Sequence, residues 1–415
     1  LYPDGTSARI PVISVTGTNG KTTTTRLIGH GLSQAGKLVG MTTTGGVFVD
    51  GEKIQGGDTT GPDSARMVLA DPAVEVAVLE TARGGIVRGG LAYDKANVAV
   101  LTNLTLDHLG QDGVETMEDL LHIKSLVAEC VQEDGVVVLN ADDENLVQLS
   151  KRLKSRIIFF SQSDNNPVLR RHLAFGGVGY YIAKGWLVEG RGHLSWEIAR
   201  IQDIPLTLGG HASFQVQNSL AAATALRALG LTRNQVAETL ASFLPSRDNP
   251  GRCMIYRMQN GGHVVLDYGH NPDGFQKLGN WLKLTPHRRL IGVVGVPGDR
   301  SNHVVRESAQ QLGRIFDYFF IKEDIDKRGR AEGEVAALLA EEIATRKSPQ
   351  MYSIVLSETQ ALGHAVELMD PGDVVVLFYE QFQPAVSLIA QLGGELVSRI
   401  EAVSQVEPAG ILATL

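Results

Sequence analysis

The chain has 415 residues, of which 43% are hydrophobic and 20% are charged. At roughly 100–200 residues per domain, this length predicts two or three domains, and the composition excludes an intrinsically disordered chain. The formal net charge is −8, from 38 Lys and Arg against 46 Asp and Glu. A nucleic-acid-binding surface usually carries the opposite sign, so we expect no nucleic-acid partner.

Cysteine usage and hydropathy indicate the compartment. Cys130 and Cys253 are too few for a disulfide framework, and no signal peptide stands out. No apolar run approaches the roughly 18 residues that a membrane span needs. We therefore expect a cytoplasmic protein with no membrane partner. The chain begins at Leu1, and residues 1–6 read as a turn-rich linker, so we expect a processed chain or a piece of a longer one.

Apolar, β-branched runs alternate with helical patterns through the first 160 residues. The predicted strands are Ile10–Val15, Val74–Leu79, Asn97–Leu101, Val136–Leu139 and Ile157–Phe160. The predicted helices between them include Thr22–Ala35 and Met117–Val131. Near-continuous apolar strands alternating with helices are typical of a parallel sheet that is covered on both faces.

The pattern becomes shorter and more alternating from about Gly177 to Gly210, which predicts an antiparallel excursion. Its strands are expected at Tyr180–Ala183, Trp186–Glu189 and Leu194–Ile198, and helices follow at Phe214–Leu229 and Thr232–Phe243. The run Ser246–Gly251 then interrupts every periodic pattern. We place the domain boundary there, with one domain at 1–250 and another at 251–415.

A second series of strands and helices follows the boundary. Its predicted strands are His263–Tyr268, Leu290–Val294, Tyr318–Lys322 and Val374–Tyr379. Its predicted helices lie near Asp273–Leu284, Val304–Phe316, Gly333–Thr345, Glu358–Leu368 and Pro384–Leu392. Alternating strands and helices again favour an α/β domain.

The octapeptide Thr16–Thr23 (Thr-Gly-Thr-Asn-Gly-Lys-Thr-Thr) lies between a predicted strand and a predicted helix. Glycines there let backbone N–H groups curl around phosphate oxygens at a helix N-terminus. Lys21 would supply charge to the β- and γ-phosphates, and the Thr22 hydroxyl can hold Mg²⁺. Val15 stands at the first glycine of the generic pattern, and an ordinary glycine turn is the alternative. The predicted ATP-binding residues here are Gly17, Thr18, Asn19, Gly20, Lys21, Thr22 and Thr23.

This octapeptide resembles the phosphate loop of the Mur ligase superfamily. Members of that superfamily use ATP to activate a carboxylate as an acyl phosphate, which an amine then attacks to form an amide. The resemblance implies ATP and Mg²⁺ as cofactors. It also implies an α/β fold class: a Mur-ligase-like central P-loop ATPase domain with a parallel sheet and a small antiparallel excursion, followed by a Rossmann-like α/β C-terminal domain.

Three more residues match the metal site of that superfamily. Glu80 ends a predicted strand, where an acidic side chain faces the ligand crevice. His108, in Asp107-His108-Leu109, resembles the histidine that binds a second magnesium. Lys124 lies on an otherwise apolar helix, where lysine is costly, and many Mur-type ligases carry a carbamylated lysine there. The implied metal ligands are Thr22, Glu80, His108 and Lys124, and the implied catalytic residues are Lys21, Glu80, His108 and Lys124. The alternatives are a surface glutamate and a structural histidine.

Four residues further along match nucleotide contacts of the same superfamily. The segment His211–Asn218 partly resembles its adenine-side segment, but Gln215 replaces an asparagine, so Asn218 is the expected contact. The Gly-Arg pair ending in Arg252 resembles one that reaches the nucleotide. Asp267–Pro272 (Asp-Tyr-Gly-His-Asn-Pro) resembles the Asp-Tyr-Ala-His-x-Pro signature and implies roles for Asp267 and His270. By contrast, the turn Asn140–Asp143 reads mainly as a structural helix cap.

Longer segments narrow the resemblance to the Mur-ligase-like half of the cyanophycin synthetases. They are Thr42–Gly46, Asp58–Ala65, Glu80–Ile86, Pro297–Arg300 and Lys322–Arg330. The resemblance implies that arginine is joined to the side-chain carboxylates of a poly-aspartate acceptor, with an ATP-grasp domain preceding this chain. Only about sixteen residues precede the phosphate loop, which disfavours a UDP-sugar substrate. Folylpolyglutamate synthetases typically carry Gly-Lys-Gly-Ser in the loop instead.

A cationic amino-acid substrate favours a pocket lined with carboxylates. Such carboxylates follow predicted strands of the second half, at Glu323, Asp324, Asp326 and Glu380, although a solvated loop is the alternative. Arg83 and Arg300 could bind the acidic polymer or phosphate, with surface salt bridges as the alternative. Thr60 and Asp299, from the shared segments, complete the predicted substrate-binding set. We also expect a homo-oligomer.

Other functions fit parts of the pattern. A stand-alone Mur-type peptide ligase, of pseudomurein or folylpolyglutamate-like type, would keep the chemistry with another amino acid and acceptor. A catalytically degenerate nucleotide-binding subunit would keep only the loop, but the matching set from Lys21 to Lys124 argues against decay. A P-loop NTPase switch would leave the segment Asp267–Pro272 unexplained.

Overall fold

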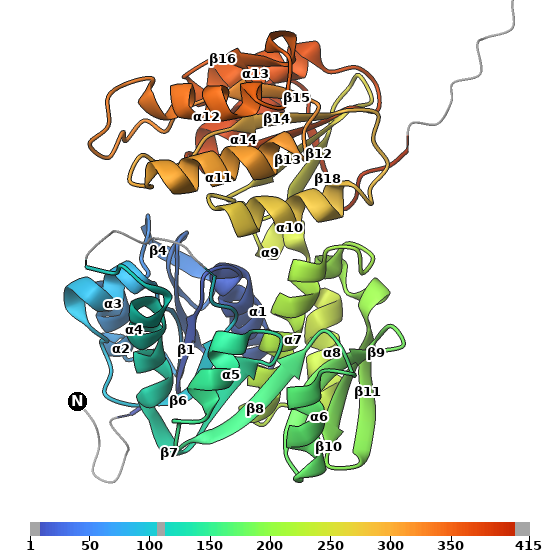
Figure 1. Cartoon of the computed structure of the whole chain (residues 1–415). Helices are drawn as coiled ribbons and strands as arrows, with labels where there is room; N and C mark the ends of the chain where they lie inside the picture. The colour runs from blue at the N-terminus through green and yellow to red at the C-terminus, as the bar shows by residue number, and fades with distance from the viewer. Residues whose placement is uncertain (1–8, 106–112, 403–415) are drawn as a thin grey trace, which may run out of the picture. The chain divides into compact units, whose positions relative to one another are not determined.

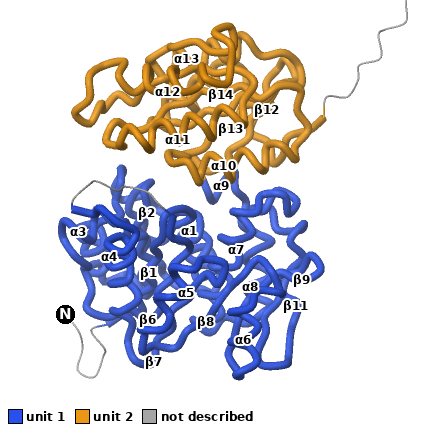
Figure 2. The backbone as a smooth tube through the Cα atoms, viewed as in Figure 1, with its two compact units in different colours: residues 1–249 blue, residues 250–415 orange. Residues whose placement is uncertain are grey.

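The computed structural model describes residues 9–105 and 113–402. The chain divides into two compact units, Leu1–Asn249 and Pro250–Leu415 (Figure 2). The division falls one residue before the boundary expected from the sequence. The aperiodic run ahead of it contains a single-turn helix, α9 (Pro245–Asp248), which the sequence pattern did not predict.

An eleven-stranded sheet forms the centre of unit 1 (Figure 1), in the order β11-β10-β9-β8-β7-β6-β1-β5-β2-β3-β4. The strands from β9 through β2 run parallel, whereas β3, β4, β10 and β11 are antiparallel to their neighbours. The bounds of the strands are β1 Val12–Thr16, β2 Val39–Thr43, β3 Gly46–Val49, β4 Glu52–Gly56, β5 Val76–Glu80, β6 Ala96–Leu101, β7 Val131–Asn140, β8 Arg156–Ser161, β9 Val178–Ala183, β10 Trp186–Arg191 and β11 Leu194–Arg200. The predicted parallel sheet and antiparallel excursion are both confirmed, and they belong to one sheet.

Alternating side chains of the buried strands pack into two hydrophobic cores, one on each face of this sheet. Ile13 and Val15 of β1 pack in the core under α1, α7 and α8, whereas Val12 packs in the core under α2 to α6. Because both faces are covered, the central strands read as continuous apolar runs. The helices of unit 1 are α1 Lys21–Gln34, α2 Pro62–Ala70, α3 Arg83–Gly89, α4 Met117–Glu129, α5 Glu144–Ser150, α6 Pro167–Ala174, α7 Ser213–Ala228, α8 Arg233–Ser242 and α9, with 3₁₀ turns at Ile201–Asp203 and Pro205–Thr207.

Unit 2 is built on a seven-stranded sheet in the order β16-β15-β14-β17-β13-β12-β18. The strands from β16 through β13 run parallel, and β12 and β18 are antiparallel additions. The bounds are β12 Met254–Arg257, β13 His263–Asp267, β14 Leu290–Val294, β15 Tyr318–Ile321, β16 Tyr352–Ile354, β17 Val374–Phe378 and β18 Glu395–Val397. The four strands predicted for this half match β13, β14, β15 and β17.

Helices cover the sheet of unit 2. α13 and α14 pack over one core, which the strands β13, β14 and β17 line, while α10, α11 and α12 pack side by side (Figure 1). Their bounds are α10 Pro272–Leu282, α11 Asn302–Gly313, α12 Glu334–Ala344, α13 Glu358–Leu368 and α14 Phe382–Gln391, and a 3₁₀ turn lies at Pro349–Met351. None of the helices that the structure describes is long and apolar enough to cross a membrane.

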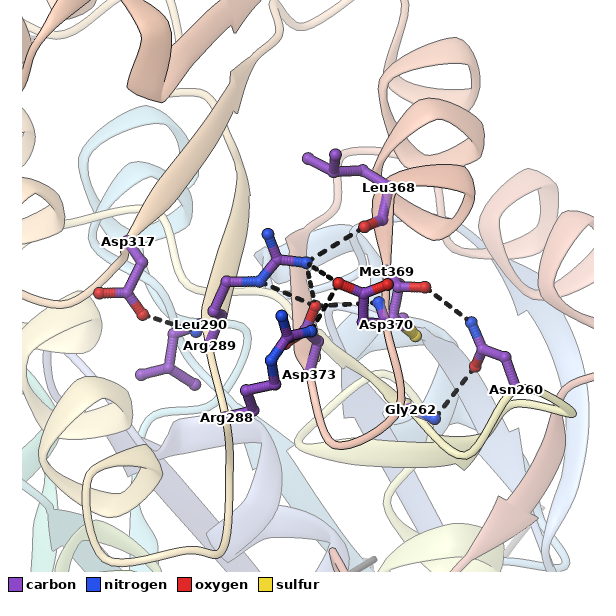
Figure 3. Close-up of polar contacts among 10 residues, drawn as sticks. All are labelled: Asn260, Gly262, Arg288, Arg289, Leu290, Asp317, Leu368, Met369, Asp370 and Asp373. Atoms are coloured by element: carbon purple, nitrogen blue, oxygen red, sulfur yellow. Dashed lines mark hydrogen bonds and ion pairs between the residues drawn. The ribbon is translucent and has the colours of Figure 1, made fainter. Parts of the chain in front are cut away.

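Charged side chains and the Asn260 amide tie together the amino ends of three parallel strands in unit 2 (Figure 3). Asp373, just before β17, has a fully buried side chain. It accepts hydrogen bonds from Arg289 Nε, at 3.0 Å, and from the backbone N–H of Asp370, at 2.9 Å. Asn260, in the turn before β13, donates from Nδ2 to Met369 O at 2.9 Å. This bond joins that turn to the segment before β17. These contacts lie at the sheet edge opposite the ligand edge of a parallel sheet.

Candidate active site

The segment between β1 and α1 forms a tight loop that only glycine allows at two positions. Gly17 has φ +145°, and a Cβ there would lie 2.0 Å from Thr102 Oγ1. Gly20 has φ +89°, and its Cβ would lie 2.1 Å from Asn218 Oδ1. The backbone therefore needs both left-handed geometry and close approach at these glycines. The predicted phosphate loop thus has the compact backbone that exposes N–H groups ahead of a helix.

The segment after β6 braces this loop. Asn103 Oδ1 accepts the Asn19 N–H at 2.9 Å, and its Nδ2 donates to Asn19 O at 2.9 Å. Thr102 Oγ1 donates to the same carbonyl at 2.7 Å. Asn140 Nδ2 in turn donates to Thr102 O at 3.0 Å. The turn Asn140–Asp143, which the sequence indicated to be structural, thus supports the segment that braces the loop. The sequence analysis assigned no role to Thr102 and Asn103, because their contacts with the loop depend on the pairing of β6 with β1.

Two lysine ammonium groups converge on the loop. Lys21 Nζ donates to Gly17 O at 3.2 Å and to Thr18 O at 2.8 Å. Lys124 Nζ, on α4, donates to Gly17 O at 2.6 Å, and the residue is 4% exposed. Positive charge is therefore concentrated beside backbone N–H groups at a helix N-terminus, an arrangement that suits an anion.

Oxygen atoms gather next to the loop where three neighbouring parallel strands end. Thr22 Oγ1, at the start of α1, donates to Glu80 Oε1 at 3.0 Å. Thr44, after β2, donates its N–H to Glu80 Oε2 at 3.1 Å, and its Oγ1 lies 3.1 Å from Thr22 Oγ1. Hydroxyl and carboxylate oxygens are the donors that Mg²⁺ prefers. Thr44 is the member of this cluster that we did not single out.

The other predicted metal ligand, His108, lies outside the described residues. Within residues 9–105 and 113–402, no group of three or more His, Cys, Asp or Glu side chains is arranged to hold a metal ion. A metal beside the loop would therefore use the Thr22 hydroxyl and the Glu80 carboxylate, with further oxygens from other groups. These two residues fit a hard divalent cation by donor type and by spacing.

The remaining predicted residues of unit 1 lie beside the loop helix or at the start of α3. Thr23 Oγ1 accepts from Asn249 Nδ2 at 3.1 Å, and Asn218 Nδ2 donates to the substituted Gln215 at 2.9 Å. Thr60 O accepts the Ala82 N–H at 3.2 Å, which places Thr60 at the start of α3. Arg83, the first residue of α3, is 7% exposed, and this burial does not fit a surface salt bridge.

In unit 2, the predicted residues Arg252, Asp267 and His270 lie close together. Asp267, at the end of β13, accepts the Cys253 N–H at 2.9 Å and the Gly269 N–H at 2.8 Å. Burial raises the pKa of its carboxyl, and the Arg252 guanidinium opposes this rise only in part. The Arg252 guanidinium carbon lies 4.6 Å from the ring centre of Tyr268. His270 Nδ1 is 3.1 Å from Tyr268 O, which fixes the turn between them.

The acidic residues after β15 are already engaged within unit 2. Glu323 accepts the N–H groups of Gly333 and Ala336 at 2.9 and 3.0 Å, and it pairs with Lys327 at 3.2 Å. Burial would raise the pKa of Glu323, but these donors outweigh it and lower the pKa. Asp324 pairs with the buried Lys322 at 2.8 Å. Both carboxylates therefore have structural partners.

Lys322 connects this acidic segment to α13. Its Nζ also pairs with Glu358 at 2.8 Å. Burial would lower the pKa of Lys322, but the two carboxylates outweigh it and raise the pKa. Glu380, after β17, accepts the N–H groups of Ile325 and Asp326 at 2.6 and 3.3 Å. The Asp326 side chain is 75% exposed, whereas Glu323 is buried and Asp324 and Glu380 are half-buried.

Asp299 and Arg300, after β14, pair with each other at 2.9 Å. Asp299 also pairs with Arg328 at 2.7 Å, which joins this loop to the segment carrying Asp326. The Arg300 side chain is only 2% exposed. A small pocket beside these loops is lined by residues of the acidic segment, including Glu323, Asp324 and Asp326.

Known proteins resemble this chain over most of its length. The family model "Mur ligase middle domain" matches residues 15–226, and the model "Mur ligase, glutamate ligase domain" matches residues 251–378. The chain belongs to the Mur ligase family. The resemblance predicted from the phosphate loop is thereby confirmed.

Among Mur ligase relatives, cyanophycin synthetase from Trichormus variabilis is 41% identical over 394 residues, which cover 95% of this chain and 44% of that protein. The diaminopimelate-adding ligase of Bacillus velezensis (UDP-N-acetylmuramoyl-L-alanyl-D-glutamate–2,6-diaminopimelate ligase) is 28% identical, over 89% of this chain and 73% of that protein. The chain thus spans less than half the length of the cyanophycin synthetases that it matches.

Solved structures share the fold. Escherichia coli FolC in complex with DHPP and ADP superposes with a TM-score of 0.68 at 20% identity, over 93% of this chain and 89% of that one. Folylpolyglutamate synthase from Mycobacterium tuberculosis, in complex with ADP and AMPPCP, gives a TM-score of 0.67 at 19% identity, over 94% and 92%. The predicted fold class is confirmed by these neighbours.

Proposed function

We propose that this Mur ligase joins arginine to the side-chain carboxylates of a poly-aspartate acceptor, with ATP as the energy source. The substrate choice rests on the 41% identity with a cyanophycin synthetase over 95% of the chain. The observation that carries the chemistry is the convergence of the glycine loop, Lys21, Lys124 and the Thr22–Glu80 pair at one sheet edge.

The proposed reaction has two steps, and each one conserves atoms and charge. An acceptor carboxylate oxygen attacks the γ-phosphorus of ATP, and the bond to ADP breaks to leave an acyl phosphate. The amine of the amino acid then attacks the acyl carbon, phosphate departs, and the amine proton passes to solvent. Lys21 and the loop N–H groups would hold the transferring phosphoryl group and offset its charge.

Thr22 and Glu80 are the described residues that would hold Mg²⁺, and His108 is a further predicted ligand. Lys124, whose ammonium group donates to Gly17 O, would become a ligand only if it were carbamylated. When bound, the ion supplies charge that neutralises the phosphate oxygens. The Thr44 N–H and the Thr22 hydroxyl each donate to one oxygen of Glu80, and these bonds fix the orientation of its carboxylate. Arg252, Asp267, His270 and Asn218 remain the proposed nucleotide contacts outside the loop.

For the amino acid, we propose that Asp326 makes the main contact with the cationic side chain. Glu323 and Asp324 already have buried partners, whereas the Asp326 carboxylate is largely exposed. Glu380 would act on substrate through the loop, because it fixes the backbone N–H of Asp326. Thr60, Arg83, Asp299 and Arg300 stay proposed contacts of the acidic acceptor or its phosphate.

The test is phosphate release from ATP and Mg²⁺ with a poly-aspartate primer, with amino acids added one at a time. We expect release with arginine alone, and arginine attached to the primer. We expect Lys21→Ala to abolish ligation while the melting temperature is retained, because the mutation removes charge from the loop and leaves the core intact. The control Lys37→Ala changes an exposed lysine of the same unit and should retain activity.

Ligation that survives in Lys21→Ala would contradict the mechanism. Stimulation by another amino acid, or only with another acceptor, would instead support a peptide ligase. That second candidate is favoured by the 28% identity with a diaminopimelate-adding ligase over 89% of the chain. ATP turnover that no amino acid stimulates would indicate a degenerate nucleotide-binding subunit.

A further inference from the structure

A tyrosine after β17 holds the glycine–arginine turn at the start of unit 2. The Tyr379 hydroxyl donates to Gly251 O at 2.9 Å and accepts from Arg252 Nη1 at 3.1 Å. Arg252 Nη1 also donates to Gly251 O at 3.1 Å, so the three groups form a closed triangle. One phenol thus fixes the turn backbone and the guanidinium together.

The geometry of this turn depends on the phenol. Gly251 has φ +79°, and a Cβ there would lie 2.1 Å from the Tyr379 hydroxyl oxygen, so the turn approaches the phenol closely. The tyrosine itself is held by its N–H, which donates to Asp267 O at 3.1 Å and extends the pairing of β13 with β17. Its ring packs against Tyr268 and Phe382, with centroids 5.5 and 5.4 Å away.

The Arg252 guanidinium is therefore held by two groups, the Tyr268 ring and the Tyr379 hydroxyl. The ring of Tyr268 lies beside its guanidinium carbon at 4.6 Å, and the Tyr379 hydroxyl accepts from one of its nitrogens. An arginine side chain carries about 2 kcal/mol of rotamer entropy, and ordering it before a ligand arrives removes part of that cost from binding. The Tyr379 hydroxyl fixes the orientation of the guanidinium, because contact with the Tyr268 ring alone would leave the guanidinium free to rotate in its own plane.

We propose that Tyr379 is a positioning residue, whose hydroxyl orients the Arg252 guanidinium for its contact with the nucleotide. The inference rests on the proposed function, in which Arg252 contacts the nucleotide. It adds a residue that neither the motif analysis nor the comparisons with relatives assigned. Tyr379 lies 127 positions from Arg252 in the chain, and the pairing of β12 with β13 and of β13 with β17 brings the two together.

The test is a double-mutant cycle with Tyr379→Phe and Arg252→Ala, read by calorimetric titration of ADP with Mg²⁺ and by the KM for ATP. Tyr379→Phe removes a hydrogen bond to a charged group, so we expect nucleotide affinity to fall about three- to tenfold with kcat nearly unchanged. In the Arg252→Ala background the same change should have no further effect. Tyr318→Phe is the matched control, because it removes a hydroxyl that bonds Ser353 at 2.9 Å elsewhere in unit 2.

The possible outcomes distinguish a failure of the positioning role of Tyr379 from a failure of the proposed function. Wild-type affinity in Tyr379→Phe, or effects of the two changes that simply add, would overturn the positioning role. A loss of affinity in Tyr318→Phe equal to that in Tyr379→Phe would show a general structural effect and overturn it as well. Wild-type protein that binds no adenine nucleotide would overturn the proposed function and this inference together. Normal nucleotide binding with no arginine ligation would overturn only the proposed substrate.

Discussion

At the scale of single residues, two separate physical constraints require glycine at position 20. The motif predicts a glycine because backbone must approach phosphate. The structure adds a second constraint, since the space where a Cβ would lie is occupied by Asn218 of α7. Asn218 is 4% exposed and held by Gln215, so it has little room to withdraw.

We expect Gly20→Ala to weaken nucleotide binding by about tenfold or more and to lower stability by about 1–2 kcal/mol, because the change combines left-handed strain with a clash. Gly36→Ala is the matched control: its φ is +78°, but no atom lies within 4 Å of the added Cβ. That variant should show the strain alone and keep nucleotide affinity. Calorimetric titration and thermal melts measure both effects, and equal losses of affinity in the two variants would refute the packing argument.

At the scale of elements, the charged residues in Figure 3 close the amino edge of the unit 2 sheet. Adjacent arginines make unequal contacts there. Arg289 pairs with the fully buried Asp373. The main partner of Arg288 is Asp370, whose side chain is 53% exposed. Removing a partner from a buried carboxylate is costly, whereas exposed ion pairs contribute little.

We expect Arg289→Met to destabilise unit 2 by about 3 kcal/mol, because it leaves the Asp373 carboxylate buried without its main cation. Arg288→Met, the neighbouring control, should cost less than about 1 kcal/mol. Urea unfolding, with hydrogen exchange of β14 and β17 to report on this unit, measures the difference. Similar losses for the two variants would mean that burial of Asp373 does not govern the network.

At the scale of the whole molecule, two half-buried histidines in unit 1 and one buried histidine in unit 2 give both units a shared response to acid. Burial lowers the pKa of His30 and His172 in unit 1 and of His263 in unit 2. His263 is 3% exposed, and its Nε2 has no hydrogen-bond partner in the part of the chain that the structure describes. Nearby Glu401 raises its pKa and Arg257 lowers it, but burial dominates.

The sign of the pH effect follows from these directions. A histidine with a lowered folded-state pKa binds more protons when unfolded, so its stabilising contribution is present above about pH 6.5 and is lost as pH falls toward the folded pKa. We expect the melting temperature to drop between pH 7.5 and 5.5, and His263→Gln to reduce the drop for unit 2. Scanning calorimetry at both pH values tests this, and a variant with the wild-type pH dependence would contradict it.

The boundary between the units also belongs to this scale. Asn249 is fully buried, and its side chain bonds Thr23 at 3.1 Å and Arg26 at 3.2 Å on α1. Its side chain is therefore anchored to α1, the helix that follows the phosphate loop, and the division falls after it. The aperiodic composition of the run predicts a boundary, but the contacts of one side chain decide which unit receives this residue.

The sequence by itself determined the local features of this protein. Continuous apolar runs predict buried parallel strands, and the loop around Lys21 predicts a phosphate site, because both depend on chemistry within a few residues. It also contained a signal that we did not use: Asp50 and Gly51, with φ +49° and +80°, form the two-residue turn of the β3–β4 hairpin. Of the remaining missed strands, β12 and β18 have only four and three residues, and β2 carries two threonines and one glycine in place of a continuous apolar run.

Tertiary structure alone decided which distant groups meet. Thr44 joins Glu80 because β2 lies beside β5, and Tyr379 joins Arg252 because β17 lies beside β13. It also decided which carboxylates are already engaged, since the partners of Glu323 come from the N-terminus of α12. A motif records which chemical groups are present, but the pairing of strands sets their distances, burial and partners.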